Sequence, residues 1–239
     1  MTTMASGTGT PVATPFRLFI FARHGESAAN VASVLSADPS QSAPLTEKGR
    51  VQARALGAQL ANVPISLAVC SRLARTRETI AIALEGRPVP VLTEPGLDEL
   101  RVGDLDGKPI EAYWDWLAQH TAGDRLPHGE SLHDALRRYA GVLHSLLARD
   151  TPVTFVVTHE FALRNIAAAA TPNRPPGAGP DFANAVPYLF DEYAVRRAAV
   201  GLTARQDLPG SNSAKDSVLP HPPGRAAHPG APPPSEAAH

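Results

Sequence analysis

The chain has 239 residues, of which 43% are hydrophobic, and a formal net charge of −1. This length and composition fit one globular domain with a sizeable core, and the near-neutral charge argues against binding nucleic acid or an anionic membrane through overall charge. The single cysteine, Cys70, excludes an intrachain disulfide and is typical of a reducing cytosol. No Lys or Arg precedes Arg17, and the apolar run at residues 18–22 is too short for a signal peptide or a membrane span. We therefore expect a cytoplasmic protein.

Both ends of the chain are rich in small residues and proline. Residues 1–15 are small and polar, and residues 206–239 are dense in Pro, Ala, Gly and His, with hardly any large apolar side chain. Such segments bury too little surface to offset the entropy lost on ordering. The sequence predicts a disordered leader over residues 1–15, one folded domain over residues 16–205, and a disordered tail over residues 206–239.

Within the predicted domain, short apolar runs alternate with stretches of helical spacing. The helix that opens at residues 45–48 has Thr46 as its expected N-cap. Further helices are expected over residues 73–84, 111–120, 132–149 and through 164 to 170. Strands are expected over residues 17–22, 67–70, 89–92, 154–158 and 186–190, with another over 194–202 closing the sheet.

This alternation predicts an α/β fold, a three-layer sandwich in which helices flank a mostly parallel central sheet. Ligands in such folds bind at the carboxyl ends of the strands. Residues that directly follow a predicted strand are therefore the first candidates for a functional site.

The strongest candidate is the run Arg23-His24-Gly25-Glu26, directly after the first strand, with Asn30 shortly beyond it. Arginine is a fixed cation that can hold a phosphate group at two points. Nearby cations favour a neutral imidazole, which can act as a nucleophile, and Gly25 would let the backbone turn and approach an anion closely. The alternative is that His24 is a core histidine that merely follows an arginine. The whole run of residues makes this interpretation much weaker than a catalytic role.

This run resembles the signature of the histidine phosphatase superfamily, the phosphoglycerate-mutase-like group. Other matches follow in the family's order. They are Leu45-Thr46 with Gly49, Gln52 and Ala53; Ser71-Arg72-Leu73-Ala74-Arg75-Thr76-Arg77-Glu78-Thr79; Leu97-Asp98-Glu99 with Gly103 and Gly107; Pro127-His128-Gly129-Glu130-Ser131; and Thr158-His159 with Arg164. Each later match is weak alone, but the ordered set is specific.

The resemblance implies a role for each matching residue. His24 would attack phosphorus and become a phosphohistidine, and Glu99 would protonate the leaving alcohol. The phosphoryl oxygens would be surrounded by Arg23, Arg75 and His159, with Asn30 as a neutral donor. Because arginines supply the positive charge, and the sequence has no compact metal-ligand spacing, no metal and no other cofactor is expected.

For several residues, the sequence leaves more than one interpretation open. Glu160 stands where the family usually has glycine after the second histidine, so it is either a helix N-terminal carboxylate that points away or a second proton donor. Arg72 and Arg77 are expected on a solvated helix face, although Arg72 could reach the remote part of the substrate. Tyr113, Trp114 and Trp116 either pack a helix or form a substrate platform, and His128 is expected near the pocket.

The leading functional hypothesis is a phosphomonoesterase that hydrolyses a small phosphorylated metabolite through a phosphohistidine on His24. Residues 105–127 form a short stretch with few basic residues, and an open site favours water as the phosphoryl acceptor. The alternatives are a phosphoglycerate-mutase-type phosphomutase and a non-catalytic domain that binds a phosphorylated ligand. A mere binder would need the arginines but not the nucleophile. The chain is expected to act as a monomer or homodimer.

Overall fold

The computed structural model describes residues 16–171 and 182–204, and its centre is a five-stranded sheet. The strands are β1 (Leu18–Arg23), β2 (Leu67–Cys70), β3 (Val91–Thr93), β4 (Val153–Thr158) and β5 (Pro187–Asp191). Their order is β3-β2-β4-β1-β5, and only the edge strand β5 runs antiparallel to its neighbour. The predicted leader and tail lie outside the described residues.

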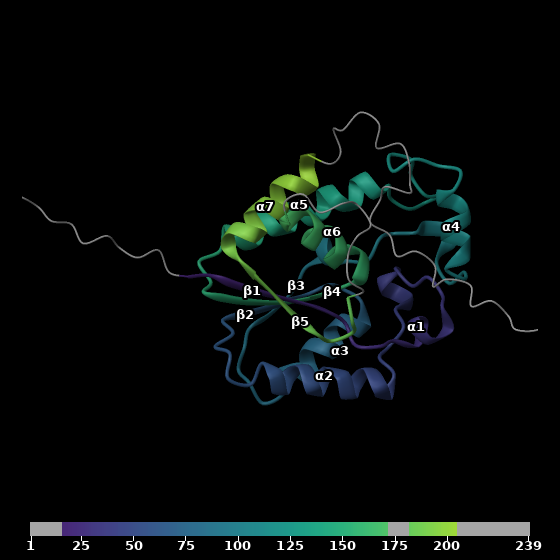
Figure 1. Cartoon of the computed structure of the whole chain (residues 1–239). Coiled ribbons are helices and arrows are strands. Elements are labelled where there is room, and N and C mark those ends of the chain that lie inside the picture. The colour runs from purple at the N-terminus through teal and green to yellow at the C-terminus, as the bar shows by residue number, and fades with distance from the viewer. Residues whose placement is uncertain (1–15, 172–181, 205–239) are drawn as a thin grey trace, which may run out of the picture.

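Helices cover both faces of this sheet (Figure 1). On one face lie α2 (Glu47–Gln59) and α3 (Ala74–Ala83), and on the other α5 (Leu132–Leu147), α6 (Glu160–Ala170) and α7 (Glu192–Ala204). The short helices α1 (Ala28–Ala32) and α4 (Glu111–Leu117) lie beyond the carboxyl ends of the parallel strands. Three 3₁₀ turns occupy Pro39–Gln41, Pro95–Leu97 and Gly103–Leu105. No helix in the described part of the chain is long and apolar enough to cross a membrane.

Alternation along the strands divides the core in two. Phe19 and Phe21 of β1 belong to the cluster packed beneath α5, α6 and α7, whereas Ile20 and Ala22 belong to the cluster beneath α2 and α3. Successive side chains on a strand point to opposite faces, so a strand buried on both faces is apolar throughout. The predicted three-layer α/β sandwich is confirmed.

Polar caps fix where the helices begin. The side chain of Thr46 accepts a hydrogen bond from the backbone nitrogen of Gly49 at 3.0 Å, so the predicted N-cap of α2 is confirmed. Ser131 caps α5 and forms a capping box with Asp134. These bonds satisfy backbone donors that would otherwise lack partners in the first helical turn.

The expected strand over residues 194–202 is wrong, because this segment belongs to α7. Its buried residues, Val195, Ala198, Ala199 and Leu202, follow the three- and four-residue spacing of one helix face. The short helix α1 was not expected, and the remaining differences concern ends: β3 runs over residues 91–93 instead of 89–92, and α4 ends at Leu117 instead of residue 120.

Candidate active site

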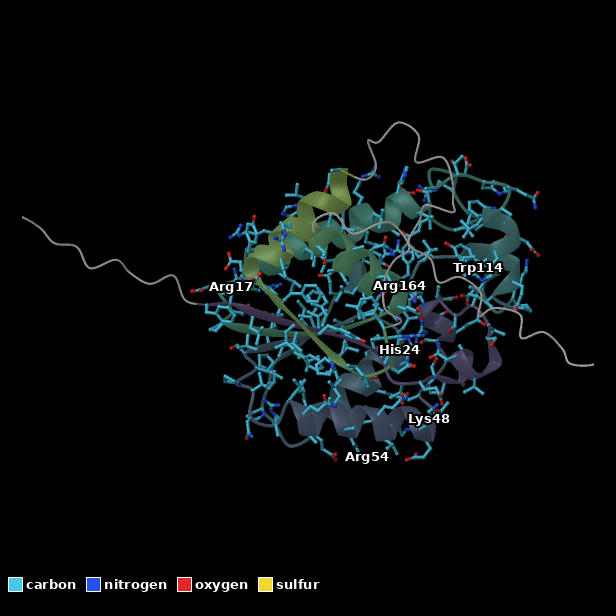
Figure 2. All side chains as sticks on the ribbon, viewed as in Figure 1. Arg17, His24, Lys48, Arg54, Trp114 and Arg164 are labelled. Atoms are coloured by element: carbon cyan, nitrogen blue, oxygen red, sulfur yellow. The ribbon has the colours of Figure 1, made fainter. Side chains whose placement is uncertain are left out.

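The two histidines of the predicted site come together at the carboxyl end of the sheet. β1 and β4 are neighbouring parallel strands in which Arg23 pairs with Thr158. His24 continues this ladder by donating its backbone N–H to the Thr158 carbonyl at 3.0 Å. As a result, the rings of His24 and His159 lie edge to face, with centroids 5.3 Å apart. Figure 2 shows His24 at the end of the sheet that faces α4 and Trp114.

His24 is held as a neutral imidazole with its lone pair on Nε2. Its Nδ1 lies 2.7 Å from the Gly25 carbonyl oxygen, which can only accept, so the ring proton is on Nδ1. Nε2 then accepts a hydrogen bond from Nε of Arg75 at 3.0 Å. Burial first, and then the charges of Arg75 and Arg23, lower the pKa of His24 well below its ordinary value. The ring is therefore a nitrogen base at neutral pH.

Arg75, in the first turn of α3, is the cation that touches His24. Its two terminal nitrogens donate to the hydroxyl of Ser36 at 3.4 Å and to the Ser36 carbonyl at 2.8 Å. Burial lowers the pKa of Arg75 to about 10, against the opposing attraction of Glu99, so the guanidinium stays charged at neutral pH. Ser36 lies in an irregular loop, and no motif marked it beforehand.

The second cation of the site, Arg23, forms an ion pair with Glu160. One oxygen of Glu160 lies 2.8 Å from Nη1 of Arg23, and the other accepts from Nε and Nη2 of Arg164 at 2.9 and 2.7 Å. Glu160 is the first residue of α6, as one interpretation held, but its side chain lines the site and does not point away. This carboxylate thus holds two guanidinium groups in place.

His159 has one satisfied ring nitrogen and one without a partner. Nε2 lies 2.8 Å from the hydroxyl of Ser71, which in turn lies 2.8 Å from the hydroxyl of Thr76. Nδ1 makes no hydrogen bond among the described residues, and the nearest carboxylate oxygen, on Glu99, is 3.9 Å away. Burial, followed by the charge of Arg75, lowers the pKa of His159 well below its ordinary value.

Nε of Arg23 is also buried without a hydrogen-bond partner among the described residues. Two unpaired nitrogens, Nδ1 of His159 and Nε of Arg23, therefore flank His24. A buried polar atom without a hydrogen bond is costly, so such atoms are suited to the oxygens of a bound ligand. Ser71 was part of the matched motif, but the motif alone assigned it no role; its place at the end of β2 is what sets it behind His159.

Glu99 lies between the histidines and the open part of the site. Its Oε1 accepts from the backbone nitrogen of Leu100 at 2.9 Å, and its side chain is 23% exposed. Burial is the main cause that raises the pKa of Glu99, with a smaller contribution from Glu160, whereas Arg75 opposes the rise. A raised pKa lets a carboxyl group keep its proton closer to neutral pH.

Asn30 presents its amide nitrogen to the site because its oxygen is engaged elsewhere. Its Oδ1 accepts from the backbone nitrogen of Ser27 at 3.0 Å and from the Ser27 hydroxyl at 3.1 Å, in the capping box of α1. Its Nδ2 makes no hydrogen bond among the described residues and lies on the wall of the cavity. An amide nitrogen in this state can only donate.

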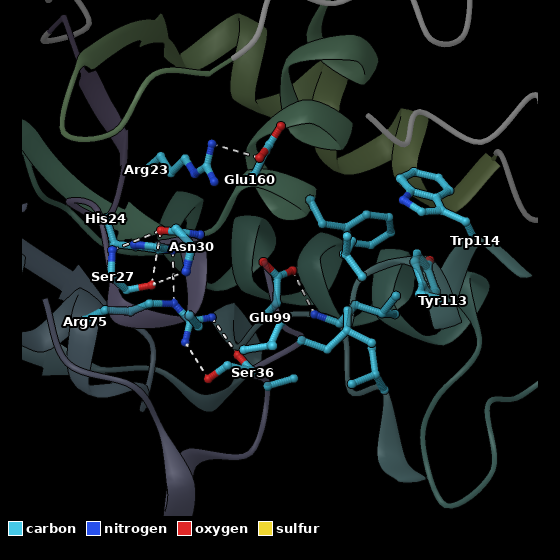
Figure 3. Close-up of a pocket in the computed structure, with 18 residues that line it drawn as sticks. Arg23, His24, Ser27, Asn30, Ser36, Arg75, Glu99, Tyr113, Trp114 and Glu160 are labelled. Carbon is cyan, nitrogen blue, oxygen red and sulfur yellow. Dashed lines mark hydrogen bonds and ion pairs between the residues drawn. The ribbon is translucent and has the colours of Figure 1, made fainter. Parts of the chain in front are cut away.

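These groups surround a cavity of about 180 Å³ (Figure 3). We call one side the polar end, made of Arg23, His24, Ser27, Asn30, Ser36 and Arg75. The apolar wall is the set of apolar and aromatic side chains that line the cavity, of which Tyr113 and Trp114 lie on the side away from His24: Val34, Leu35, Ala37, Leu100, Val102, Ile110, Tyr113, Trp114 and Phe161. Figure 3 shows Glu99 between the polar end and these two aromatic side chains. The predicted site residues thus lie together, with His159 directly behind His24.

Other candidates lie elsewhere. Arg72 precedes α3 and donates to the buried carboxylate of Asp98 at 2.6 Å; its side chain is 43% exposed, as expected of a solvated residue, and does not line the cavity. The expectation for His128 is wrong: its side chain is 85% exposed and pairs with Asp104, outside the cavity. Trp116 stacks on His120 with ring centroids 4.1 Å apart. Among the described residues, no group of three or more His, Cys, Asp or Glu side chains could hold a metal ion.

Gly25 serves close backbone packing and not the turn that the sequence suggested. It does not adopt a positive φ, but a Cβ added to it would lie 2.5 Å from the carbonyl oxygen of Gly49 at the start of α2. Gly25→Ala is therefore expected to destabilise the fold by about 1–3 kcal/mol, because backbone must move. Gly141→Ala is the matched control: on α5 it meets no atom within 4 Å, and replacing glycine within a helix should stabilise it slightly. Urea unfolding of both variants measures this, and equal midpoints for Gly25→Ala and wild type would contradict the packing role.

The comparisons with known proteins agree with this geometry. The family model of the histidine phosphatase superfamily (branch 1) matches residues 19–188. The adenosylcobalamin/alpha-ribazole phosphatase of Salmonella typhimurium is 34% identical, across 59% of this chain and 73% of that protein. A protein of Yersinia pestis named "Probable phosphoglycerate mutase GpmB" is 33% identical, across 59% of this chain and 68% of its own length.

Among solved structures, Bacillus stearothermophilus YhfR superposes with a TM-score of 0.64 at 28% identity, covering 72% of this chain and 90% of that one. The fold is therefore shared as well as the sequence signature. The family predicted from the ordered motifs is confirmed: this chain belongs to the histidine phosphatase superfamily, branch 1.

Proposed function

We propose that this protein is a phosphomonoesterase that hydrolyses a small phosphorylated metabolite through a phosphohistidine on His24. The observation that carries the proposal is the state of His24: a buried, neutral imidazole, fixed through Nδ1, whose Nε2 lone pair lies beside a cationic guanidinium. A histidine in this position can attack the phosphorus atom of an anionic phosphate group that the arginines bind.

In the first step, the Nε2 lone pair of His24 forms a bond to phosphorus while the bond from phosphorus to the alcohol oxygen breaks. Arg75 exchanges its hydrogen bond with Nε2 for one to a phosphoryl oxygen. Arg23 Nε, His159 Nδ1 and Asn30 Nδ2 donate to the same oxygens, on which negative charge builds up. Glu99 gives its proton to the departing alcohol oxygen.

In the second step, water attacks the phosphohistidine and the nitrogen–phosphorus bond breaks. The carboxylate of Glu99 takes the proton of this water, which returns both residues to their starting state. Ser71 serves as a positioning residue: its hydroxyl donates to Nε2 of His159 and thereby keeps the ring proton on Nδ1, toward the phosphoryl group.

Hydrolysis is favoured over a mutase reaction by the charges that line the cavity. Arg23 and Arg75 are its cationic side chains among the described residues, and both lie at the polar end. A phosphoglycerate carries a carboxylate besides its phosphate, and the apolar wall offers no cation to bind it. The relative named as an alpha-ribazole phosphatase supports a phosphatase acting on a small metabolite.

The test of this function is release of inorganic phosphate from 4-nitrophenyl phosphate by the purified full-length chain. We expect turnover to persist in excess EDTA, because guanidinium groups supply the positive charge that a metal ion would otherwise bring. Activity lost in chelator and restored by added magnesium or zinc would contradict the metal-free mechanism. A well-folded protein that released no phosphate from any monoester would leave the binding domain as the better hypothesis.

A further inference from the structure

The cavity changes character on the far side of Glu99. Apart from His159, which lies behind His24, the residues proposed to contact the phosphoryl group belong to the polar end, and Tyr113 and Trp114 of the apolar wall lie opposite (Figure 3). If the phosphorus meets Nε2 of His24 and the leaving oxygen meets Glu99, the rest of the alcohol extends onto the apolar wall. The nature of this wall therefore selects the substrate.

Most of the wall is apolar, and its buried Tyr113 hydroxyl has no hydrogen-bond partner among the described residues. Val102 and Leu100 are buried, 3% and 4% exposed, and Phe161 is 7% exposed. Trp114 is partly exposed and offers its ring at the edge of the cavity. Aromatic rings favour edge-to-face and offset contacts with other rings, and they contribute more burial per side chain than aliphatic residues.

Charge in the same region disfavours a second anionic group on the substrate. Apart from the two arginines of the polar end, the cavity is lined by no cationic side chain among the described residues. Two carboxyl groups, Glu99 and Glu160, also line the cavity, and neither can attract an anion. A carboxylate or second phosphate on the alcohol would lose water here without gaining a cation as its partner.

We propose that the substrate is the phosphate monoester of an uncharged alcohol that carries an apolar ring, and that the ring packs against Trp114 on the apolar wall. This inference rests on the proposed phosphatase function. It adds a specificity-determining residue, Trp114, on the short helix α4, and it excludes esters that carry a second anionic group, such as phosphoglycerates, as preferred substrates.

The first experiment compares kcat/KM for benzyl phosphate, glycerol 3-phosphate and 3-phosphoglycerate. All three release an alkyl alcohol, so the demand on the general acid is similar and the comparison reports on binding of the alcohol. Burying a ring of this size is expected to favour benzyl phosphate over glycerol 3-phosphate by roughly 10–100-fold. 3-Phosphoglycerate, which carries a carboxylate besides its phosphate, should be the poorest of the three.

The second experiment uses two tryptophans of the same helix. Trp114 lines the cavity, whereas Trp116 stacks on His120 outside it. Trp114→Ala should lower the ratio of kcat/KM for benzyl phosphate to that for glycerol 3-phosphate by about tenfold. Trp116→Ala, which removes an equal side chain from α4, should keep the wild-type ratio. Because the readout is a ratio, a shared loss of stability or of active protein cancels.

The outcomes separate this inference from the proposed function. Hydrolysis of all three esters at similar rates, or an unchanged ratio in Trp114→Ala, would overturn the substrate class and leave the phosphatase standing. A folded protein that hydrolysed neither these esters nor 4-nitrophenyl phosphate would overturn both. A preference for benzyl phosphate that is lost in Trp114→Ala alone is the supporting result.

Discussion

Replacing His24 by alanine is expected to lower kcat by about 10⁴-fold or more, on every phosphate ester that the wild type hydrolyses. The reason is that no other group can take its place. The neighbouring His159 turns Nε2 toward Ser71, and its Nδ1 is placed to donate to the phosphoryl group. Water alone would then have to attack the bound phosphate ester, with no covalent intermediate to divide the reaction into two steps. Loss of the nucleophile should thus exceed the loss from any other single substitution.

His24→Asn tests whether the loss of activity in His24→Ala comes from loss of the fold. The side-chain amide can still donate to the Gly25 carbonyl, but it has no nucleophilic nitrogen. His144→Ala, on an exposed site of α5, controls for removal of a histidine as such. Circular dichroism should show all three variants folded, and only the two His24 variants should be inactive.

The intermediate can also be observed directly. Rapid quenching at alkaline pH preserves a phosphoramidate, so mass spectrometry of the wild type during turnover should find one added phosphoryl group on the peptide with His24. The His24→Asn protein should carry none. Near-normal turnover by His24→Ala, or a phosphoryl group on another residue, would refute the mechanism.

The parts of this site that could be predicted from the sequence lie where strands end. The apolar runs at β1 and β4 marked two buried strands, and parallel pairing alone brings the following residues, His24 and His159, to one edge. Thr46 was identifiable as a cap because hydrogen bonding at an N-terminus is local. These predictions depend on short-range chemistry and on the geometry of a parallel sheet.

The parts that could not be predicted depend on contacts between distant segments. The loop that carries Ser36 reaches Arg75 only in the folded chain, 39 positions along the sequence. Likewise, Trp114 lines the cavity while Trp116 does not, because the packing of α4 decides which face of that helix is turned inward. The segment over residues 194–202 is short and apolar enough to fit a strand or a helix, and only its packing against α5 and α6 settled the matter.

The geometry bears most directly on the role of Glu160, which the sequence left open. Its position after His159 allowed it to be a proton donor or a helix-terminal carboxylate. In the structure both of its oxygens contact guanidinium groups, those of Arg23 and Arg164. These contacts give Glu160 a role in positioning the two arginines. Burial raises the pKa of Glu99, the other candidate for the general acid.

The general acid can be identified by how strongly each carboxylate matters for a poor leaving group. A nitrophenolate leaves without help, whereas an alkyl alkoxide needs a proton. Glu99→Gln is therefore expected to lower kcat/KM about 10²–10⁴-fold on an alkyl phosphate and far less on 4-nitrophenyl phosphate. Glu160→Gln, the matched control, should cause a small and equal loss on both, since it weakens the hold on Arg23 but removes no proton.

The pH profile gives a second reading of the same assignment. The acid must be protonated, so wild-type activity on the alkyl ester should fall as pH rises through the raised pKa of Glu99. This descending limb of the pH profile should be absent in Glu99→Gln and should persist in Glu160→Gln. If Glu160→Gln instead showed the difference between leaving groups and lost the limb, the acid would be Glu160. Glu99 would then be a carboxylate that orients the substrate beside His159, and the ion pair of Glu160 with Arg23 would have to open during each turnover.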